Sequence, residues 1–152
     1  MNLALKEACK NQKNKFLDGG PFGAVVVKDG KVIASAHNKV LKTHDVTSHA
    51  EINAIRKACK KLKTHDLSGC IIYTTSYPCP MCIGAIIWAN IKTIYYGNSK
   101  EETNAIGFRD DIIYNVINNL DKNETINFIK VNDKEIKDIY TEFKNTKSNK
   151  MY

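Results

Sequence analysis

Two short segments of the chain carry residue types that bind metal ions. Residues 49–51 read His-Ala-Glu, and residues 78–82 read Pro-Cys-Pro-Met-Cys. Thiolate sulfur and imidazole nitrogen are ligands that Zn²⁺ prefers, in a tetrahedral arrangement. The spacing of Cys79 and Cys82 lets both bind one ion from the first turn of a helix, and His49 can supply a third ligand. Because three protein ligands leave the fourth position open for water, this set predicts a catalytic zinc site.

Glu51 is the candidate for moving protons at this site. It lies two residues after His49, which is too close for a good fourth ligand. A carboxylate there can take a proton from water, whose pKa a bound zinc ion lowers to about 7, and can later protonate a leaving amine. A structural zinc site is one alternative, and a zinc-stabilised binding module in which Glu51 is idle is another. The structural site would take its fourth ligand from His44, His65, Cys59 or Cys70.

The composition predicts one globular domain spanning residues 1–152. The chain is 43% hydrophobic and 26% charged, as soluble domains are. No segment approaches about 18 consecutive apolar residues, so we expect no membrane-spanning helix. The N-terminus becomes charged too early for a secretory signal. We therefore expect a cytoplasmic protein in which Cys9, Cys59 and Cys70 are ordinary thiols.

The net charge of +7 only weakly indicates a nucleic-acid partner. Arginine occurs only at positions 56 and 109, so nearly all 23 basic residues are lysine, whereas bidentate contacts to phosphates and bases favour arginine. The densest basic segment, residues 56–63, lies beside apolar residues at helical spacing, which indicates a solvated helix face. A basic helix that touches RNA stays an alternative.

Helical and strand patterns alternate along the chain after an initial hairpin. This alternation indicates an α/β sandwich with a mixed sheet. Residues 38–47 are expected to be a loop. Helices are predicted over residues 3–17, 49–62, 80–90, much of 100–120 with a break at Gly107, and 133–145. Strands are predicted at residues 22–28, 31–36, 70–75, 93–96 and 126–131, with a two-residue turn at Asp29-Gly30 between the first two.

The sequence resembles the cytidine-deaminase-like superfamily, and within it most closely the bacterial guanine deaminases. The combination H-x-E…P-C-x-x-C is the signature of zinc nucleobase deaminases. The resemblance covers nearly the whole chain. Its most specific parts are residues 19–24, 47–51, 54–59, 78–86, Trp88-Ala89, Gly107-Phe108, Ile113-Tyr114 and the terminal Tyr152.

The resemblance implies a three-layer α/β/α sandwich with a five-stranded mixed sheet. It also implies a homodimer that exchanges its C-terminal segment, with one zinc ion per subunit on His49, Cys79 and Cys82 and with Glu51 as the proton shuttle. Phe22 would stack on a purine, Asn38 would bond to its edge, and Tyr152 would come from the partner if the tail is exchanged. The complete implied substrate pocket is Phe22, Asn38, Ala50, Trp88, Asp110 and Tyr152.

The activity implied by the resemblance is hydrolytic deamination of guanine to xanthine and ammonia. The family pattern places two acids directly after Phe108, whereas this chain has Arg109 before Asp110 and Asp111. Asp110 keeps the aligned position, and Asp111 is the alternative. A tRNA adenosine deaminase is the alternative enzyme, as is a deaminase of another free base or nucleoside. The charges of residues 133–147 balance, unlike those of a helix that binds RNA.

Overall fold

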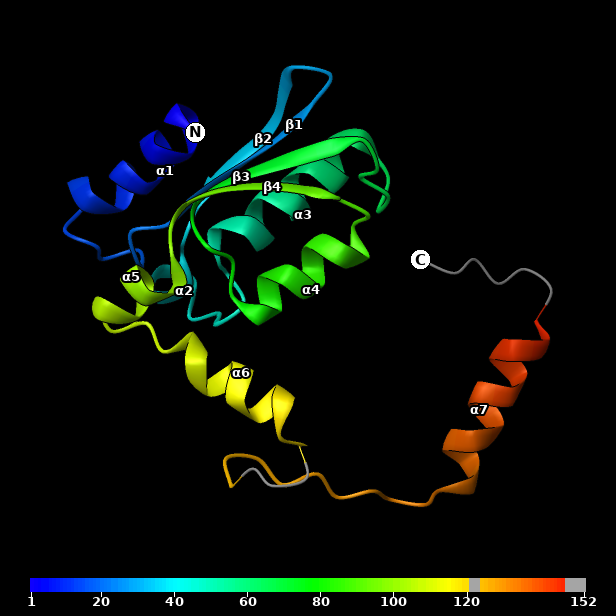
Figure 1. Cartoon of the computed structure of the whole chain (residues 1–152). Coiled ribbons are helices and arrows are strands. Elements are labelled where there is room, and N and C mark those ends of the chain that lie inside the picture. The colour runs from blue at the N-terminus through cyan, green and yellow to red at the C-terminus, as the bar shows by residue number, and fades with distance from the viewer. Residues whose placement is uncertain (121–123, 147–152) are drawn as a thin grey trace. The chain divides into compact units, whose positions relative to one another are not determined.

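The computed structural model describes residues 1–120 and 124–146. Four strands form one mixed sheet in the order β2-β1-β3-β4 (Figure 1). The strands are β1 (Gly23–Lys28), β2 (Lys31–His37), β3 (Cys70–Ser76) and β4 (Thr93–Asn98). The helices are α1 (Asn2–Lys13), α2 (Val40–Thr43), α3 (Ala50–Leu62), α4 (Pro80–Trp88), α5 (Lys100–Ala105), α6 (Asp110–Asn118) and α7 (Lys134–Asn145).

β1 and β2 form the hairpin that the sequence predicts. Asp29 and Gly30 have φ angles of 49° and 71°, and a type I′ turn needs positive φ at both of its central residues. β1 then pairs antiparallel with β3, and β3 pairs parallel with β4. A parallel pair needs a crossover connection, and α4 provides it. This topology places the start of α4 directly after the end of β3.

Helices cover both faces of the sheet. α3 and α4 lie against one face and α1 lies against the other (Figure 1). The core on the α3 side consists of alternate strand residues such as Ala24, Val26 and Ile72, packed against small side chains of α3. On the α1 side, a Cβ on Gly23 would lie 2.1 Å from the carbonyl oxygen of Ala4. Glycine therefore lets the backbones of α1 and β1 touch.

A buried carboxylate joins α1 to β2. Glu7 accepts hydrogen bonds from Lys10 Nζ at 2.7 Å and from Ser35 Oγ at 2.7 Å, and its second oxygen lies 3.0 Å from His37 Nδ1. Burial raises the pKa of Glu7, but the hydrogen bonds from Lys10, His37 and Ser35 outweigh burial and hold that pKa at about 2. Glu7 is therefore ionised at neutral pH.

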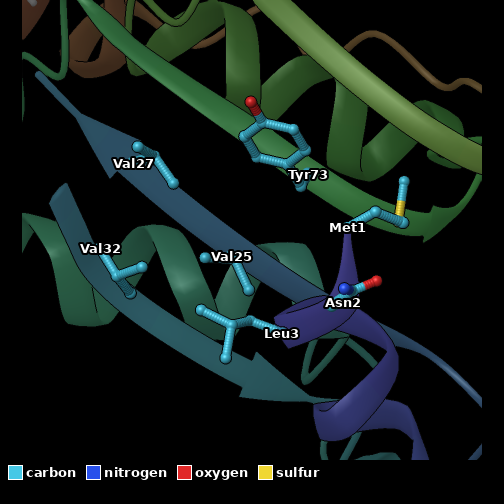
Figure 2. A pocket seen from close by; sticks show the side chains of 7 residues that line it. All are labelled: Met1, Asn2, Leu3, Val25, Val27, Val32 and Tyr73. Atoms are coloured by element: carbon cyan, nitrogen blue, oxygen red, sulfur yellow. The ribbon is translucent and has the colours of Figure 1, made fainter. Parts of the chain in front are cut away.

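The first residues of α1 leave an apolar hollow on their face of the sheet. Figure 2 shows this cavity of about 330 Å³. Tyr73 at its side stacks on Tyr95 of β4, with ring centroids 4.9 Å apart, so the apolar face continues toward the sheet edge. The lining residues are Met1, Asn2, Leu3, Val25, Val27, Val32 and Tyr73.

The prediction of five strands was wrong for the described residues. Residues 126–131 have the expected apolar pattern but form no strand, and Ile129 is 83% exposed. A strand exists only by pairing its backbone with a neighbour, and side-chain pattern alone does not supply that neighbour. Residues 40–43, expected as loop, form the short helix α2. The expected helix break at Gly107 is present, with φ of +95°.

Contacts divide the chain into two compact units. Met1–Tyr114 holds the whole sheet and helices α1 to α5, and Asn115–Tyr152 holds the end of α6 and all of α7. In α7, the Asp133 side chain caps the first turn by accepting from the amides of Glu135 and Ile136. The single domain with an exchanged tail stays a prediction. None of the helices in the described ranges is both long enough and apolar enough to cross a bilayer.

Candidate active site

The three predicted metal ligands meet at the starts of two helices. His49 is the N-cap residue of α3, Cys79 is that of α4, and Cys82 lies in the first turn of α4. The sulfurs of Cys79 and Cys82 lie 3.5 and 3.6 Å from Nδ1 of His49. Tetrahedral zinc, with bonds of about 2.3 Å to sulfur and about 2.0–2.1 Å to nitrogen, separates such atoms by about 3.5 Å. The side chains therefore fit a zinc ion without rearrangement.

The two cysteines of this cluster differ in how readily they form the thiolate that a zinc ion binds. The thiol of Cys82 donates a hydrogen bond to Cys79, which lowers the pKa of Cys79. Burial opposes this effect and His49 adds to it, and the resulting pKa of Cys79 is about 4. The same bond, together with burial, raises the pKa of Cys82. The positive ends of the α3 and α4 dipoles further favour thiolates. Among the described residues, no other group of potential ligands comes together in this way, so Cys9, Cys59 and Cys70 stand apart from it.

Glu51 projects from the first turn of α3 beside this cluster. It is buried, and burial raises the pKa of its carboxyl, while a hydrogen bond from Thr74 opposes that rise. Thr74 Oγ1 donates to Glu51 Oε1 at 2.6 Å, and the thiol of Cys82 lies 3.5 Å from Oε2. A carboxyl whose pKa lies nearer neutrality can both accept and release a proton at working pH. This geometry suits the predicted proton shuttle.

A small cavity opens at the cluster. Its volume is about 30 Å³, roughly the space of one water molecule, so a larger ligand requires lining side chains to move. Phe22 and Phe108 form one side, packed edge to face with ring centroids 4.7 Å apart. The residues that line the cavity are Phe22, His49, Glu51, Ser76, Tyr77, Cys79, Thr103, Phe108 and Asp110.

The predicted substrate residues divide into those that the structure brings to this cavity and those that it does not. Phe22 and Asp110 line the cavity, and Asp111 does not. Burial raises the pKa of Asp110. Ala50 lies between His49 and Glu51 as the first residue of α3, where helical amides have no acceptor within the helix.

Asn38 and Trp88 are not among the residues that line the cavity, although the amide of Asn38 donates a hydrogen bond to the carbonyl of Phe22 at 3.0 Å. The side-chain oxygen of Asn38 accepts a hydrogen bond from the amide of Val40 at 3.1 Å, and its backbone carbonyl accepts from Asn11 at 2.8 Å. Trp88 is at the far end of α4 from Cys79 and is 64% exposed. Tyr152 lies outside the described residues. The substrate roles of these residues stay predictions.

Four lining residues were not among the predicted site residues. Ser76 and Tyr77 directly precede the Pro-Cys-Pro-Met-Cys segment, so their closeness to Cys79 along the chain was an available signal. Phe108 lies in the Gly107-Phe108 segment that supports the family resemblance, but no function was predicted for it. Thr103 gave no local signal, because only the fold brings α5 to the end of β3.

Comparison with known proteins finds a family model, MafB19-like deaminase, that matches residues 3–146. The chain is 49% identical over 113 residues to guanine deaminase of Bacillus subtilis (strain 168), covering 74% of this chain and 72% of that protein. It is 43% identical over 106 residues to the tRNA-specific adenosine deaminase of Agrobacterium fabrum, covering 70% and 68%.

Solved structures show the same likeness. The structure of Bacillus subtilis guanine deaminase superimposes with a TM-score of 0.90 at 42% identity, covering 99% of this chain and 95% of that one. A structure of guanine deaminase from Nitrosomonas europaea gives a TM-score of 0.66 at 34% identity, covering 72% and 62%. The fold and the grouped His, Cys and Glu side chains therefore occur together in a chain that is similar to deaminases.

Proposed function

The chain belongs to the MafB19-like deaminase family, and we propose that it is a zinc-dependent guanine deaminase that converts guanine and water to xanthine and ammonia. The choice of guanine as substrate rests on how much of the chain superimposes on a guanine deaminase. The superposition on Bacillus subtilis guanine deaminase extends over 99% of this chain with a TM-score of 0.90, whereas the superposition on a solved tRNA:A34 deaminase structure covers 66% with a TM-score of 0.62.

Different residues at the cavity would bind the metal and transfer the protons. His49, Cys79 and Cys82 would hold one zinc ion per subunit, which supplies an activated water near neutral pH. Glu51 takes one proton from the attacking water and passes it to a ring nitrogen of the base. It then takes the second proton from the newly added hydroxyl and delivers it to the amine, so that the C=O bond forms as the C–N bond breaks and ammonia leaves. Because Thr74 anchors one oxygen of Glu51, the other oxygen is oriented for these transfers.

Phe22 and Asp110 would bind the base. The aromatic ring of Phe22 lies in the cavity wall, where it would stack on a flat base, and the carboxylate of Asp110 would accept hydrogen bonds from ring or amine N–H groups. Asn38, Ala50, Trp88 and Tyr152 stay part of the proposed substrate site on the resemblance alone.

We further propose that the protein is a cytoplasmic homodimer that exchanges its C-terminal segment. The apolar side chains of α7 support an exchange, because Ile136, Ile139, Tyr140 and Phe143 are all more than half exposed and such residues are normally covered by a partner. A reducing compartment keeps the cysteine ligands as thiols.

A substrate panel tests the proposed activity. Purified protein loaded with zinc is incubated with guanine, guanosine, adenosine, cytosine and tRNA, and ammonia release is measured for each. We expect release from guanine well above that from the others. Release from tRNA alone would instead establish the alternative of a tRNA adenosine deaminase and overturn the guanine proposal.

A further inference from the structure

Ser76 lies two residues after Thr74, whose hydroxyl donates a hydrogen bond to Glu51. Thr74 and Ser76 both point to the buried face of β3, because side chains two residues apart on a strand point to the same side. Thr74 donates to Glu51, and Ser76 lines the same cavity as Glu51. Ser76 is therefore placed beside the atoms that would react.

The direction of the Ser76 hydrogen bond depends on a chain of hydroxyls. Thr103 Oγ1 donates to the carbonyl oxygen of Ser99 at 2.9 Å, and a hydroxyl has only one proton to donate. Ser76 and Thr103 are hydrogen-bonded to each other. In the arrangement where the proton of Thr103 goes to Ser99, Ser76 is the donor in that pair. Both side chains are buried, so little water competes for these bonds.

The consequence is that Ser76 presents lone pairs, and no proton, to the cavity. The backbone amide of its neighbour Tyr77 is also occupied, because it donates to the carbonyl of Asn98 at 2.8 Å. The carboxylates of Glu51 and Asp110, on the same cavity, accept hydrogen bonds when ionised. This part of the wall is therefore complementary to a ligand edge that carries N–H groups.

We propose that Ser76 is a specificity-determining residue that accepts a hydrogen bond from a ring N–H next to the amine-bearing carbon of the substrate. The inference rests on the proposed guanine deaminase activity. In guanine that carbon has the N1–H group as a neighbour. In adenine and cytosine the neighbouring ring nitrogen carries a lone pair instead, which would face the lone pairs of Ser76. A buried acceptor left without its donor disfavours such substrates.

A pair of substrates tests the role of Ser76. Guanine and 2-aminopurine both carry the amine on C2, but only guanine has the N1–H group. For Ser76→Ala we expect kcat/KM for guanine to fall about 3- to 10-fold, the loss of one neutral hydrogen bond. For 2-aminopurine we expect kcat/KM to stay the same or rise, because its N1 lone pair no longer faces those of Ser76. Equal losses for both substrates, or no change in either, would overturn the proposal.

Variants of Thr103 test the hydroxyl chain separately and do not depend on how Ser76→Ala folds. Thr103→Val removes the acceptor of the Ser76 proton, so the ratio of kcat/KM for guanine over 2-aminopurine should fall in the same direction. Thr103→Ser keeps the hydroxyl and should keep the wild-type ratio. Ser68→Ala, at an exposed turn, controls for the loss of a hydroxyl elsewhere.

The outcomes separate this inference from the proposed function. A wild-type ratio in Thr103→Val, in protein whose thermal unfolding matches that of Thr103→Ser, overturns the hydroxyl chain. Guanine turnover with an unchanged ratio in Ser76→Ala overturns the role of Ser76 alone. A wild-type protein that releases no ammonia from guanine overturns the proposed function together with this inference.

Discussion

The hydroxyl of Thr74 on β3 donates a 2.6 Å hydrogen bond to the buried carboxylate of Glu51 on α3. This bond joins the centre of the sheet to the helix whose N-cap residue is His49. It fixes one carboxylate oxygen of Glu51 and leaves the other near Cys82. The position of the proposed proton shuttle therefore depends on the register of a strand as well as on its own helix.

Glu51→Gln should abolish deamination while leaving the fold and the zinc content intact. The amide oxygen of Gln can still accept from Thr74, but Gln cannot carry a proton. We expect ammonia release from guanine to fall at least about 10²- to 10⁴-fold. Glu124→Gln, an exposed acid, serves as the control. Normal turnover by Glu51→Gln would show that another group moves the proton.

Thr74→Val should lower activity without changing zinc content. It leaves a buried carboxylate without its hydroxyl donor, and a hydrogen bond to a charged group contributes about 1.5–3 kcal/mol. We expect kcat to fall about tenfold or more, while Thr74→Ser, which keeps the hydroxyl, stays near the wild type. If both variants are equally active, the Thr74–Glu51 bond plays no part in turnover.

Removal of zinc should lower both activity and thermal stability. Zinc that binds only the folded chain stabilises it by about 4 kcal/mol at a concentration 1,000 times its Kd, which corresponds to a rise in Tm of roughly 10 °C. Unfolding is followed by circular dichroism after dialysis against a chelator and after zinc is restored. Cys82→Ser should lose the zinc-dependent rise, and Cys9→Ser should keep it. Full activity in protein confirmed to be metal-free would rule out the zinc role.

Stability should fall in acid because of Glu7. Its pKa is about 2 in the folded protein against an ordinary value of 4.5, so its stabilising contribution is complete above pH 4.5 and is lost as pH falls toward 2. Glu7→Gln should lower the free energy of unfolding at pH 7 by about 1–3 kcal/mol and flatten the loss between pH 4.5 and 2. Urea unfolding across this range measures both effects, with exposed Glu142→Gln as the control. An unchanged slope in Glu7→Gln would contradict this assignment.

Mixed dimers should reveal whether the tail is exchanged. If Tyr152 of one chain serves the site of its partner, a heterodimer of Glu51→Gln and Tyr152→Ala chains contains one complete site. Co-expressed and co-purified heterodimer should then recover about half of the wild-type kcat. Recovery no greater than that of the Tyr152→Ala homodimer would show that each tail serves its own chain, and a monomer by light scattering would exclude the exchange.

Features that depend on neighbours along the chain could be predicted from the sequence. The hairpin turn at Asp29-Gly30 follows from backbone preferences of two residues. The grouping of Cys79 with Cys82 follows from the geometry of one helical turn, and the placement of His49 beside them was inferred from the same helix-start pattern together with zinc chemistry. The turn and the cysteine pair agree with the structure because local spacing alone constrains them, whereas the position of His49 followed from the ligand set that zinc needs.

Features that depend on pairing between distant segments were decided only by the tertiary structure. The pattern of residues 126–131 suits a strand, but the backbone of a strand needs a partner, and the described sheet ends at β4. Likewise, nothing local links Thr103 to Ser76, because α5 reaches the end of β3 only after β4 pairs in parallel with β3. The sequence by itself thus determined which atoms could hold a metal and move a proton. The folding of β3 against α3 and α5 decided which hydroxyl bonds to the carboxylate and which atoms line the cavity.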